Sequence, residues 1–359
     1  MTTVTAALVP DDTRPPAPLV PVGDVRVVPT GEWDRVVARL GGRDTYTGAA
    51  YSAVSALLEP PGTRPVLLHH RAADGEVALP LLLRPLPGGT GWDALSAYGY
   101  GGPVSRGGRP VPSLAGALDA WARVNGVVAT FLRLHPLLGN ARAVPPSAEL
   151  VPVGSTVAWD LSAGRDLAAG MHPHHRRAAR RADRAGLTVE VVRRPASLAE
   201  FRALYEVTMR RQSADPFFYF PAAYWDALLA AGDALEPLLV EGRLDGELVA
   251  ALLCFRGGRR LHYHLGASAD VARTLGASNR CFLAAATWGQ AEGMSVFHLG
   301  GGLGGNPDSP LFVFKHRFAP ADEPLPFHVA KLVHDRERYR ELAGTDSTAG
   351  FFPPWRRGD

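Results

Sequence analysis

Two segments near the C-terminus carry residues that could stabilise a developing negative charge. The first, Phe297–Gly302, ends in three glycines, and the second, Leu311–Phe318, contains Phe314 and Lys315. Consecutive glycines let a backbone approach a ligand closely and leave N–H groups free to donate. Donors directed at an oxyanion often contribute most to the formation of an amide from an ester or thioester. We therefore predict a reaction site at Gly300–Gly302 and Lys315.

The use of lysine at position 315 strengthens this prediction. Only two of the 38 basic side chains are lysine, Lys315 and Lys331, and all the others are arginine. A lysine in such a chain suggests a need for a compact, mobile ammonium that a planar guanidinium does not replace. The alternative is a surface lysine without a chemical role.

A short glycine-containing loop precedes one of the predicted helices. It runs from Arg273 through Gly276 and Ala277 to Ser278 and Asn279. Backbone amides at a helix N-terminus bind anions, so these five residues are candidates for holding a phosphate group. The alternative is an ordinary helix start that Ser278 caps.

Arginines gather in two further places. Arg176, Arg180 and Arg184 recur at four-residue spacing on a predicted helix and so share one face. That face could meet a polyanion such as RNA, although basic helix faces are often simply solvated. A second basic and aromatic stretch follows, and its candidate substrate-binding residues are Arg210, Arg211 and Tyr219.

Several histidines are candidate bases for an acceptor amine, because histidine titrates near neutrality. His262 and His264 alternate around Tyr263 and so point to one face of a predicted strand. His298 begins the glycine segment, and we include it among the candidate catalytic residues. The sequence does not decide which of them, if any, is the general base. The histidines at 172–175 lack further ligands at metal-binding spacing, so we expect no metal site.

Matching residues occur in the same order in the two halves of the chain. The matching pairs are Asp74 and Asp245, Trp121 and Trp288, Gly126 and Gly293, Phe131 and Phe297, and Asn140 and Asn306. Each half also predicts the same elements: two apolar strands around an Asp-Gly turn, a third strand, a helix that ends at glycine, and a last strand. These elements cover residues 65–69, 76–83, 94–100, 113–125 and 127–134, then 236–240, 247–255, 261–266, 278–292 and 295–299. We therefore predict a tandem duplication of an α/β layered domain.

Composition limits the class of protein. A chain of 359 residues that is 46% hydrophobic and 20% charged is typical of a globular protein with two domains. The two cysteines, Cys254 and Cys281, form no disulfide framework, which fits a reducing compartment. The first basic residue is Arg14, which argues against a signal peptide, and no apolar run reaches membrane-spanning length. We expect a cytoplasmic protein without membrane insertion.

The order and spacing of four segments resemble the FemABX-like transferases, a family of the GNAT acyltransferase superfamily. These segments are Ala97–Pro103, Val157–Ser162, the basic helix His174–Gly186, and the triple glycine with Phe314 and Lys315. The resemblance covers about residues 44–320. It implies two GNAT domains in tandem, the Phe314–Lys315 pair at the transfer site, and the Arg273–Ser278 loop where GNAT enzymes bind pyrophosphate. Ser278 departs from the small residue that ends that loop in the family.

The resemblance also implies a reaction. Members transfer an aminoacyl group from aminoacyl-tRNA, a co-substrate rather than a bound cofactor, to an amine of a cell-wall precursor, a peptide or another natural product. Peptidoglycan and antibiotic biosynthesis are the corresponding settings. Relatives of the same fold use acyl-CoA, which is the alternative donor. A second alternative is a non-catalytic protein that binds RNA or a precursor. The oligomeric state stays open.

The predicted organisation has four parts. A flexible arm covers residues 1–25, and an N-terminal GNAT-like domain covers 26–160. The catalytic GNAT-like domain covers 161–345, and an irregular tail covers 346–359. The first domain lacks the triple glycine and the Phe-Lys pair, so we expect it to bind the acceptor or to serve as a scaffold.

Overall fold

The computed structural model describes residues 18–358, so most of the predicted arm at residues 1–25 lies outside the described residues. The first half contributes the strands β1 (Val25–Val28), β2 (Arg64–Ala72), β3 (Gly75–Pro85), β4 (Trp92–Leu95), β5 (Val104–Ser105), β6 (Val127–Arg133) and β7 (Glu149–Asp160). The second half contributes β8 (Thr188–Arg193), β9 (Pro237–Leu244), β10 (Glu247–Gly257), β11 (Arg260–Ser268), β12 (Val296–Gly301) and β13 (Leu325–Val333).

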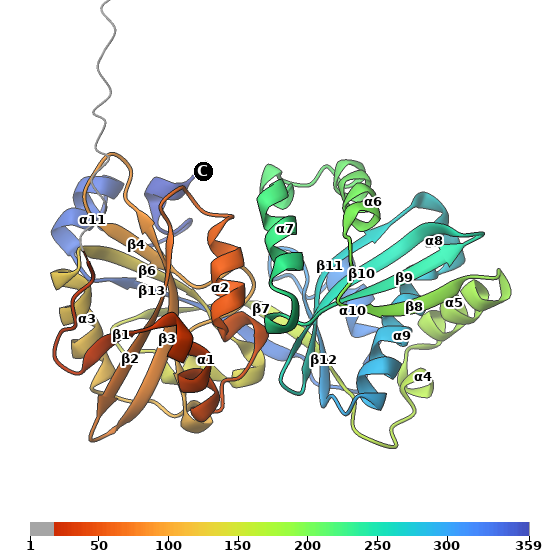
Figure 1. Ribbon diagram of the computed structural model, residues 1–359, viewed down its shortest axis with the longest axis horizontal. Coiled ribbons are helices and arrows are strands. Elements are labelled where there is room, and N and C mark those ends of the chain that lie inside the picture. Colours follow the sequence, from red (N-terminus) through yellow and green to blue (C-terminus); the bar gives the residue numbers. More distant parts are fainter. Residues whose placement is uncertain (1–17, 359) are drawn as a thin grey trace, which may run out of the picture.

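Helices cover this sheet in both lobes of the molecule (Figure 1). In the first half these are α1 (Thr30–Arg39), α2 (Ala49–Ala56) and α3 (Leu114–Val124). In the second half they are α4 (Leu167–Gly170), α5 (Pro173–Arg184), α6 (Ala199–Arg211), α7 (Ala222–Ala230), α8 (Asp270–Leu275), α9 (Ala277–Ala291), α10 (Pro310–His316) and α11 (Arg336–Ala343). None of the helices within residues 18–358 combines the length and the apolar character that crossing a bilayer requires.

The two halves repeat one topology, as the matching residues predicted. The hairpin β2–β3 corresponds to β9–β10, and the parallel pair β4–β6 corresponds to β11–β12. Trp121 and Trp288 occupy the same turn of the equivalent helices α3 and α9, and Gly126 and Gly293 follow those helices with a left-handed backbone. The duplication is therefore confirmed by equivalent elements.

The last strand of each half pairs with the other half. The strand β7 follows β6 in sequence but pairs with β12, and β13 follows β12 but pairs with β6. The two exchanged strands also pair with each other, so the sheet runs β1-β2-β3-β4-β6-β13-β7-β12-β11-β10-β9-β8, with β5 beside β3. In Figure 1, β13 and α11 accordingly lie among the elements of the first half. A boundary between residues 160 and 161 therefore does not separate two self-contained units.

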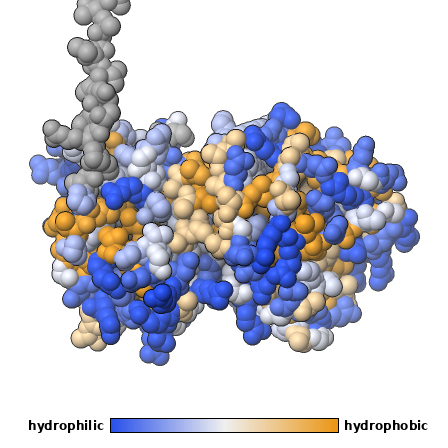
Figure 2. Space-filling view, in the orientation of Figure 1, coloured by the Kyte–Doolittle hydropathy of each residue, from blue (hydrophilic) through white to orange (hydrophobic). Residues whose placement is uncertain are grey.

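Aromatic side chains join the lobes above the exchanged strands. Tyr46 and Tyr51 of the first half share one buried cluster with Phe201, Tyr224 and Phe255 of the second. The face seen in Figure 2 is mostly hydrophilic toward its rim, with hydrophobic residues gathered over the middle of each lobe. Such a shared apolar cluster keeps the two lobes in a fixed arrangement, because separating them would expose it to water.

Two local features differ from what the sequence pattern indicates. The third strand of the first half ends at Leu95 rather than at residue 100: the chain still pairs with β6 through Ser96 and Gly101, but residues 97–100 loop out between these contacts. The spacing of Ser197 and Glu200 is typical of a capping box. The structure does not contain one, because α6 begins at Ala199 and Glu200 instead pairs with Arg243.

The C-terminal tail is irregular, as predicted, but it is packed. Lys331, the second lysine, donates from Nζ to the carbonyl oxygen of Thr348 at 2.5 Å. Arg356 is buried and donates to the fully buried carboxylate of Asp93 at 2.9 Å. Lysine at 331 therefore serves to anchor the tail.

Candidate active site

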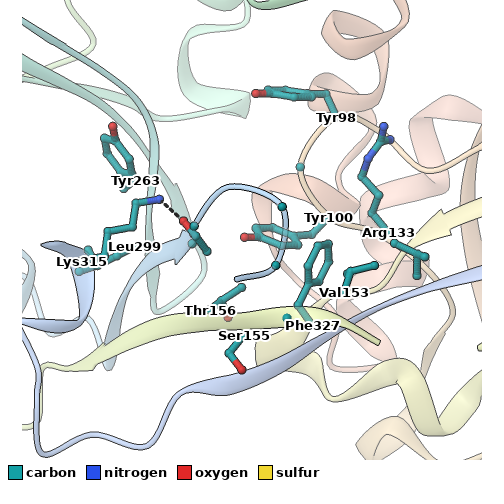
Figure 3. A pocket seen from close by; sticks show the side chains of 18 of the residues that line it. Tyr98, Tyr100, Arg133, Val153, Ser155, Thr156, Tyr263, Leu299, Lys315 and Phe327 are labelled. Atoms are coloured by element: carbon teal, nitrogen blue, oxygen red, sulfur yellow. Dashed lines mark hydrogen bonds between the residues drawn. The ribbon is translucent and has the colours of Figure 1, made fainter. Parts of the chain in front are cut away.

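A cavity of about 900 Å³ lies between the two lobes. The first half lines it with Tyr98, Tyr100 and Arg133, and β7 adds residues 152–156. The second half lines it with the glycine segment, Lys315 and Tyr263, among others. In Figure 3, Lys315 and Tyr263 lie on one side of this cavity and Tyr98 and Arg133 on the other. We call it the acceptor cavity.

Lys315 reaches the acceptor cavity from the helix α10. Pro310 and the capping hydroxyl of Ser309, which accepts from the N–H of Phe312 at 3.3 Å, start this helix directly after the glycine segment. The Lys315 side chain is only 6% exposed, and its Nζ donates to the carbonyl oxygen of Gly301 at 2.8 Å. Burial lowers the pKa of Lys315 to about 7. Burial is the only cause of this shift, and no carboxylate partner offsets it among the described residues.

The three predicted glycines all line the acceptor cavity but are needed for different reasons. Gly300 has a left-handed backbone with φ of 74°, and a Cβ there would lie 3.3 Å from Tyr100 Oη and 3.5 Å from Lys315 Nζ. A side chain on Gly301 would meet a β7 carbonyl at 2.9 Å, and one on Gly302 would meet Ser309 Oγ at 2.1 Å. Gly300 therefore keeps the space beside the ammonium open, whereas Gly301 and Gly302 permit close packing.

A second cavity of about 450 Å³ lies on the other side of Tyr263. Its lining includes Phe314, Arg273, Asn279 and Arg317, and we call it the donor cavity. Tyr263 lines both cavities, while Lys315 lines only the first and Phe314 only the second. The predicted Phe-Lys pair therefore spans the wall between the two cavities.

Comparison with known proteins agrees with this geometry. Residues 172–308 match the family model of the acetyltransferase (GNAT) domain. The second half of the chain is a GNAT domain. No curated protein sequence matches the chain.

Solved structures extend the likeness to both halves. The crystal structure of FemX matches with a TM-score of 0.63 at 14% identity, over 89% of this chain and 100% of that one. The C-terminal domain of a putative lysylphosphatidylglycerol synthetase from Agrobacterium fabrum matches with a TM-score of 0.55 at 18% identity, over 86% of this chain and 94% of that one. A tandem GNAT protein from the clavulanic acid biosynthesis pathway matches with a TM-score of 0.50 at 14% identity, over 86% and 98%. The chain thus shares the fold of FemX and of the tandem GNAT protein. Together with the GNAT domain match at residues 172–308, this makes it an acyltransferase of the GNAT type.

The predicted phosphate-binding loop of this GNAT domain divides into two groups. Arg273, Ser278 and Asn279 line the donor cavity, and the buried Nδ2 of Asn279 has no hydrogen-bond partner within residues 18–358. Gly276 and Ala277 instead pack inside the domain. Gly276 has a φ of 81°, and a Cβ there would lie 2.6 Å from the carbonyl oxygen of Ala178 in α5. The glycine of this loop is thus required by helix packing rather than by an anion.

The basic helix α5 has a different exposed face from the one predicted. Its alanines, among them Ala178, are buried, while Arg177, Arg180 and Arg184 are exposed. Arg176 turns back and donates to the carbonyl oxygen of Ala169 at 2.6 Å, so its grouping with Arg180 and Arg184 was wrong. The same helix also supports the wall between the two cavities, because His175 Nε2 lies 2.9 Å from the carbonyl oxygen of Phe314.

The stretch from residue 210 to 219 contributes its phenylalanines rather than the residues we predicted. Phe217 and Phe218 line the acceptor cavity. Arg211 pairs with Asp270 at 2.8 Å, and the side chains of Arg210 and Tyr219 are exposed outside both cavities. The predicted substrate contacts of Arg210, Arg211 and Tyr219 therefore do not form at these cavities.

His298 belongs to a buried cluster behind Tyr100 rather than to either cavity. It is 1% exposed, its ring centre lies 5.0 Å from that of Tyr100, and burial lowers its pKa well below the ordinary value. This placement contradicts a direct catalytic role. His264 does line the acceptor cavity, where burial lowers its pKa to about 3 and Tyr224 Oη lies 2.7 Å from its Nε2. It is therefore a neutral imidazole.

The cluster behind Tyr100 also contains a buried carboxylate with the ligand types of a metal site. Asp44, His135 and His262 each offer one ligand atom within 4.8 Å of the others. His262 Nε2 lies 2.9 Å from Asp44 Oδ2, and His135 Nε2 lies 3.2 Å from Oδ1. Burial would raise the pKa of Asp44, but His262 and His135 hold it well below the usual range. Each oxygen of the Asp44 carboxylate thus already contacts one imidazole. The absence of a metal site stays a prediction.

Sequence reasoning missed three residues of the acceptor cavity: Tyr98, Tyr263 and Arg133. Tyr98 was assigned to a strand, and Tyr263 served only as a spacer between histidines. Arg133 carried a signal that could have found it, since it is a charged residue inside an otherwise apolar strand.

Proposed function

We propose that this acyltransferase forms amide bonds by moving an aminoacyl group from aminoacyl-tRNA to an amine of a small-molecule or peptide acceptor. The observation that carries the proposal is the wall between the two cavities. Tyr263 lines both cavities, Phe314 faces the donor cavity and Lys315 the acceptor cavity. Two substrates that enter from opposite sides would meet at this wall, which is the arrangement that group transfer requires.

The acceptor amine attacks the acyl carbon, and the negative charge develops on the carbonyl oxygen beside Lys315. The Nζ of Lys315 has two further N–H groups besides the one that donates to Gly301 O, and the missing side chain of Gly300 leaves room beside it. An ammonium fixed in a water-poor site stabilises such charge more strongly than it would in water.

The leaving group needs a proton, and Tyr263 is the candidate donor. Its ring lies 5.2 Å from Lys315 Nζ, and burial raises its pKa, so it stays a protonated phenol. The acceptor nitrogen loses a proton in the same step, and this proton restores the Tyr263 phenol as the C–O bond of the ester breaks, so that the net transfer is from the amine to the leaving oxygen. Proton transfer from a positioned side chain typically contributes about a hundredfold to ten-thousandfold.

The charge around the donor cavity favours a polyanionic donor. Arg273 and Arg317 line it, and no carboxylate does among the described residues. The exposed arginines of α5, Arg177, Arg180, Arg181 and Arg184, extend this positive surface beyond the cavity. Such an extended basic surface suits a nucleic acid, whose phosphates continue past the 3′ end. The fold likeness to FemX supports the proposal at the level of architecture.

Acyl-CoA is the second candidate donor, and a specific observation favours it. Arg273, Ser278 and the unpartnered Asn279 Nδ2 lie at the start of α9, where a pyrophosphate would find an arginine and free helix amides. Both donors need the same support for the oxyanion, so the catalytic residues fit either one.

A reconstituted reaction distinguishes the two donors. Amino acid, its synthetase, tRNA and a panel of amine acceptors are incubated with the protein, with and without RNase, beside a parallel panel of acyl-CoA donors. The proposal expects amide product that RNase abolishes. Product from acyl-CoA alone, insensitive to RNase, would replace aminoacyl-tRNA by acyl-CoA.

A further inference from the structure

The acceptor cavity is positively charged at both sides. Its lining contains two charged side chains, Arg133 and Lys315, and no aspartate or glutamate among the described residues. His264, the other titratable base in the lining, is neutral because burial lowers its pKa to about 3. Lys315 belongs to the transfer site, so the charge of Arg133 needs a separate explanation.

Arg133 is a cation without an ion pair in the part of the chain that the structure describes. It ends β6, and its guanidinium lies 5.3 Å from the ring centre of Phe131. The nearest acidic influence is Glu59, whose carboxylate is already paired with Arg84 at 3.0 Å. Burial lowers the pKa of Arg133, yet arginine stays charged in proteins. The guanidinium is therefore a charge that the folded chain leaves uncompensated.

Hydrogen bonds fix the backbone of Arg133, so its side chain starts from a fixed position. The N–H of Arg133 donates to Ser96 Oγ at 2.8 Å, and its carbonyl oxygen accepts from the N–H of Gly101 at 2.7 Å. These are the two contacts between which residues 97–100 loop out, and that loop carries Tyr98 beside the guanidinium (Figure 3). Arg133 and Tyr98 thus form one preorganised corner of the cavity, away from Lys315.

We propose that Arg133 binds a carboxylate of the acceptor, so that the acceptor is an amine that also carries a free acid, such as an amino acid or a peptide with a free C-terminus. This inference rests on the proposed function, because it assigns the acceptor to this cavity. A planar guanidinium forms paired hydrogen bonds with a carboxylate, and such charge-assisted bonds are strong in an enclosed site. Binding of one acid would neutralise this half-buried charge.

The surroundings favour a carboxylate over a phosphate and give the acceptor an apolar body. Arg133 is the single cation in its corner, and phosphate sites usually combine several cations or a helix N-terminus. Tyr100 and Phe327 lie between Arg133 and Lys315 (Figure 3), and Phe217, which also lines the cavity, packs against Tyr98. A volume of about 900 Å³ is within the range of sites that enclose a whole small molecule. The acid would be bound at one end, and the amine would reach Lys315 at the other.

Binding of a minimal probe tests the proposal without any transfer reaction. Hydrocinnamic acid, its neutral amide and inorganic phosphate are titrated into the wild-type protein and followed by NMR. We expect the acid to bind roughly tenfold to a hundredfold more tightly than the amide, the usual worth of charged hydrogen bonds. We expect Arg133→Gln to remove this preference. Equal binding of acid and amide, tighter binding of phosphate, or no detectable binding of either probe at millimolar concentration would each overturn the proposal.

Stability separates a binding role from a structural one. If Arg133 serves a ligand, the unliganded Arg133→Gln protein should unfold at the same temperature as wild type or higher, because a half-buried charge without an ion pair among the described residues is lost. A clear loss of stability would indicate a structural arginine. Arg338→Gln, which changes an exposed arginine of α11 that pairs with Glu341, is the matched control and should keep the acid preference.

Transfer assays then link the site to the reaction. Dipeptides and their C-terminal amides are compared as acceptors with aminoacyl-tRNA and with acyl-CoA. We expect the free acids to be preferred through a lower KM, and Arg133→Gln to remove that preference. If no donor supports transfer while the acid preference in binding persists, the proposed function fails and the binding site stands. Preference for the amides would contradict the binding site itself.

Discussion

The ends of two equivalent strands, β6 and β12, perform different tasks in this molecule. Each strand follows a helix that ends at a left-handed glycine, and each pairs in parallel with the third strand of its half. The strand β6 ends at Arg133, which faces the acceptor cavity, while β12 runs into Gly300 and the loop that leads to Lys315. The duplicated fold therefore presents two similar strand ends to one cavity. In the function that we propose, one binds an anion and the other stabilises charge during transfer.

The exchange of β7 and β13 explains how both strand ends reach the same cavity. The segment Val153–Thr156 of β7 lines its floor together with Phe327 of β13. Because each of these strands pairs with the opposite half, neither half could complete the cavity alone. The ends of β6 and β12 thus face the same cavity only because the central strands β7 and β13 join the two halves.

Replacing Lys315 should have the largest effect on the reaction. We expect Lys315→Met to lower kcat about a hundredfold to a thousandfold, because one donor to the oxyanion is lost. Lys315→Arg should restore little, since a planar fork does not fit beside Gly301 and Tyr263. Steady-state kinetics with folding checked by circular dichroism provide the measurement. Full activity in Lys315→Arg would show that the compact ammonium is not needed.

The substitution Lys315→Met should stabilise the unliganded protein. Burial lowers the folded-state pKa of Lys315 from 10.5 to about 7, so below pH 7 the folded state holds an unfavourable buried charge. Between pH 7 and 10 the unfolded chain binds more protons, and wild-type stability should rise with pH. Allowing about 1.5 kcal/mol for the lost bond to Gly301, we expect Lys315→Met to gain about 3 kcal/mol at pH 6 and to lose about 1 kcal/mol at pH 10.

Denaturant unfolding at the two pH values measures this gain. Lys331→Met is the matched control, because Lys331 donates to the carbonyl oxygens of Thr348 and Gly350 and its removal should destabilise the protein. A loss of stability in Lys315→Met at pH 6 would show that the ammonium is structural.

The pH dependence of the rate distinguishes an ammonium donor from an amine base at position 315. If the protonated form stabilises the oxyanion, single-turnover rates should fall about tenfold for each pH unit above the pKa of Lys315, which lies at about 7. A rate that instead rises through pH 7 would assign Lys315 the role of general base.

Charge on α5 should have a smaller effect, confined to the donor. Neutralising Arg177, Arg180 and Arg184 together should weaken the binding of aminoacyl-tRNA and reduce the slope of log affinity against log salt by about 2. Arg176→Gln is the contrast, because Arg176 binds backbone carbonyls and its loss should lower stability instead. An unchanged salt slope in the triple variant would leave α5 as a solvated helix.

Chelation should have no measurable effect. The carboxylate of Asp44 is already contacted by His262 and His135, so we expect EDTA to change neither activity nor melting temperature. Metal analysis of the purified protein checks the same point. A stoichiometric transition metal, or a lower melting temperature after chelation, would make this cluster a structural metal site.

Local signals in the sequence predicted much of the architecture, and they singled out Gly300–Gly302 and Lys315, which the structure brings together in one cavity. Asp-Gly turns and helix-ending glycines marked the duplicated elements, and the rarity of lysine singled out Lys315. Both signals are local, so they can be recognised without knowing which distant strands pair. The exchange of β7 and β13 is itself a pairing between distant strands, and Asp44, His135 and His262 meet only because the fold brings three separate segments together. The prediction of a catalytic role for His298 was wrong for the same reason, because residues distant in the sequence bury its side chain.

The central claim is that the second half performs the transfer while the first half holds the acceptor. Its most direct test is to measure kcat and the KM for an acidic acceptor in Lys315→Met and Arg133→Gln side by side. The account predicts a loss of kcat with a nearly unchanged KM in the first variant, and a raised KM with a nearly unchanged kcat in the second. A raised KM in Lys315→Met together with a lost kcat in Arg133→Gln, or the same change in both, would contradict it.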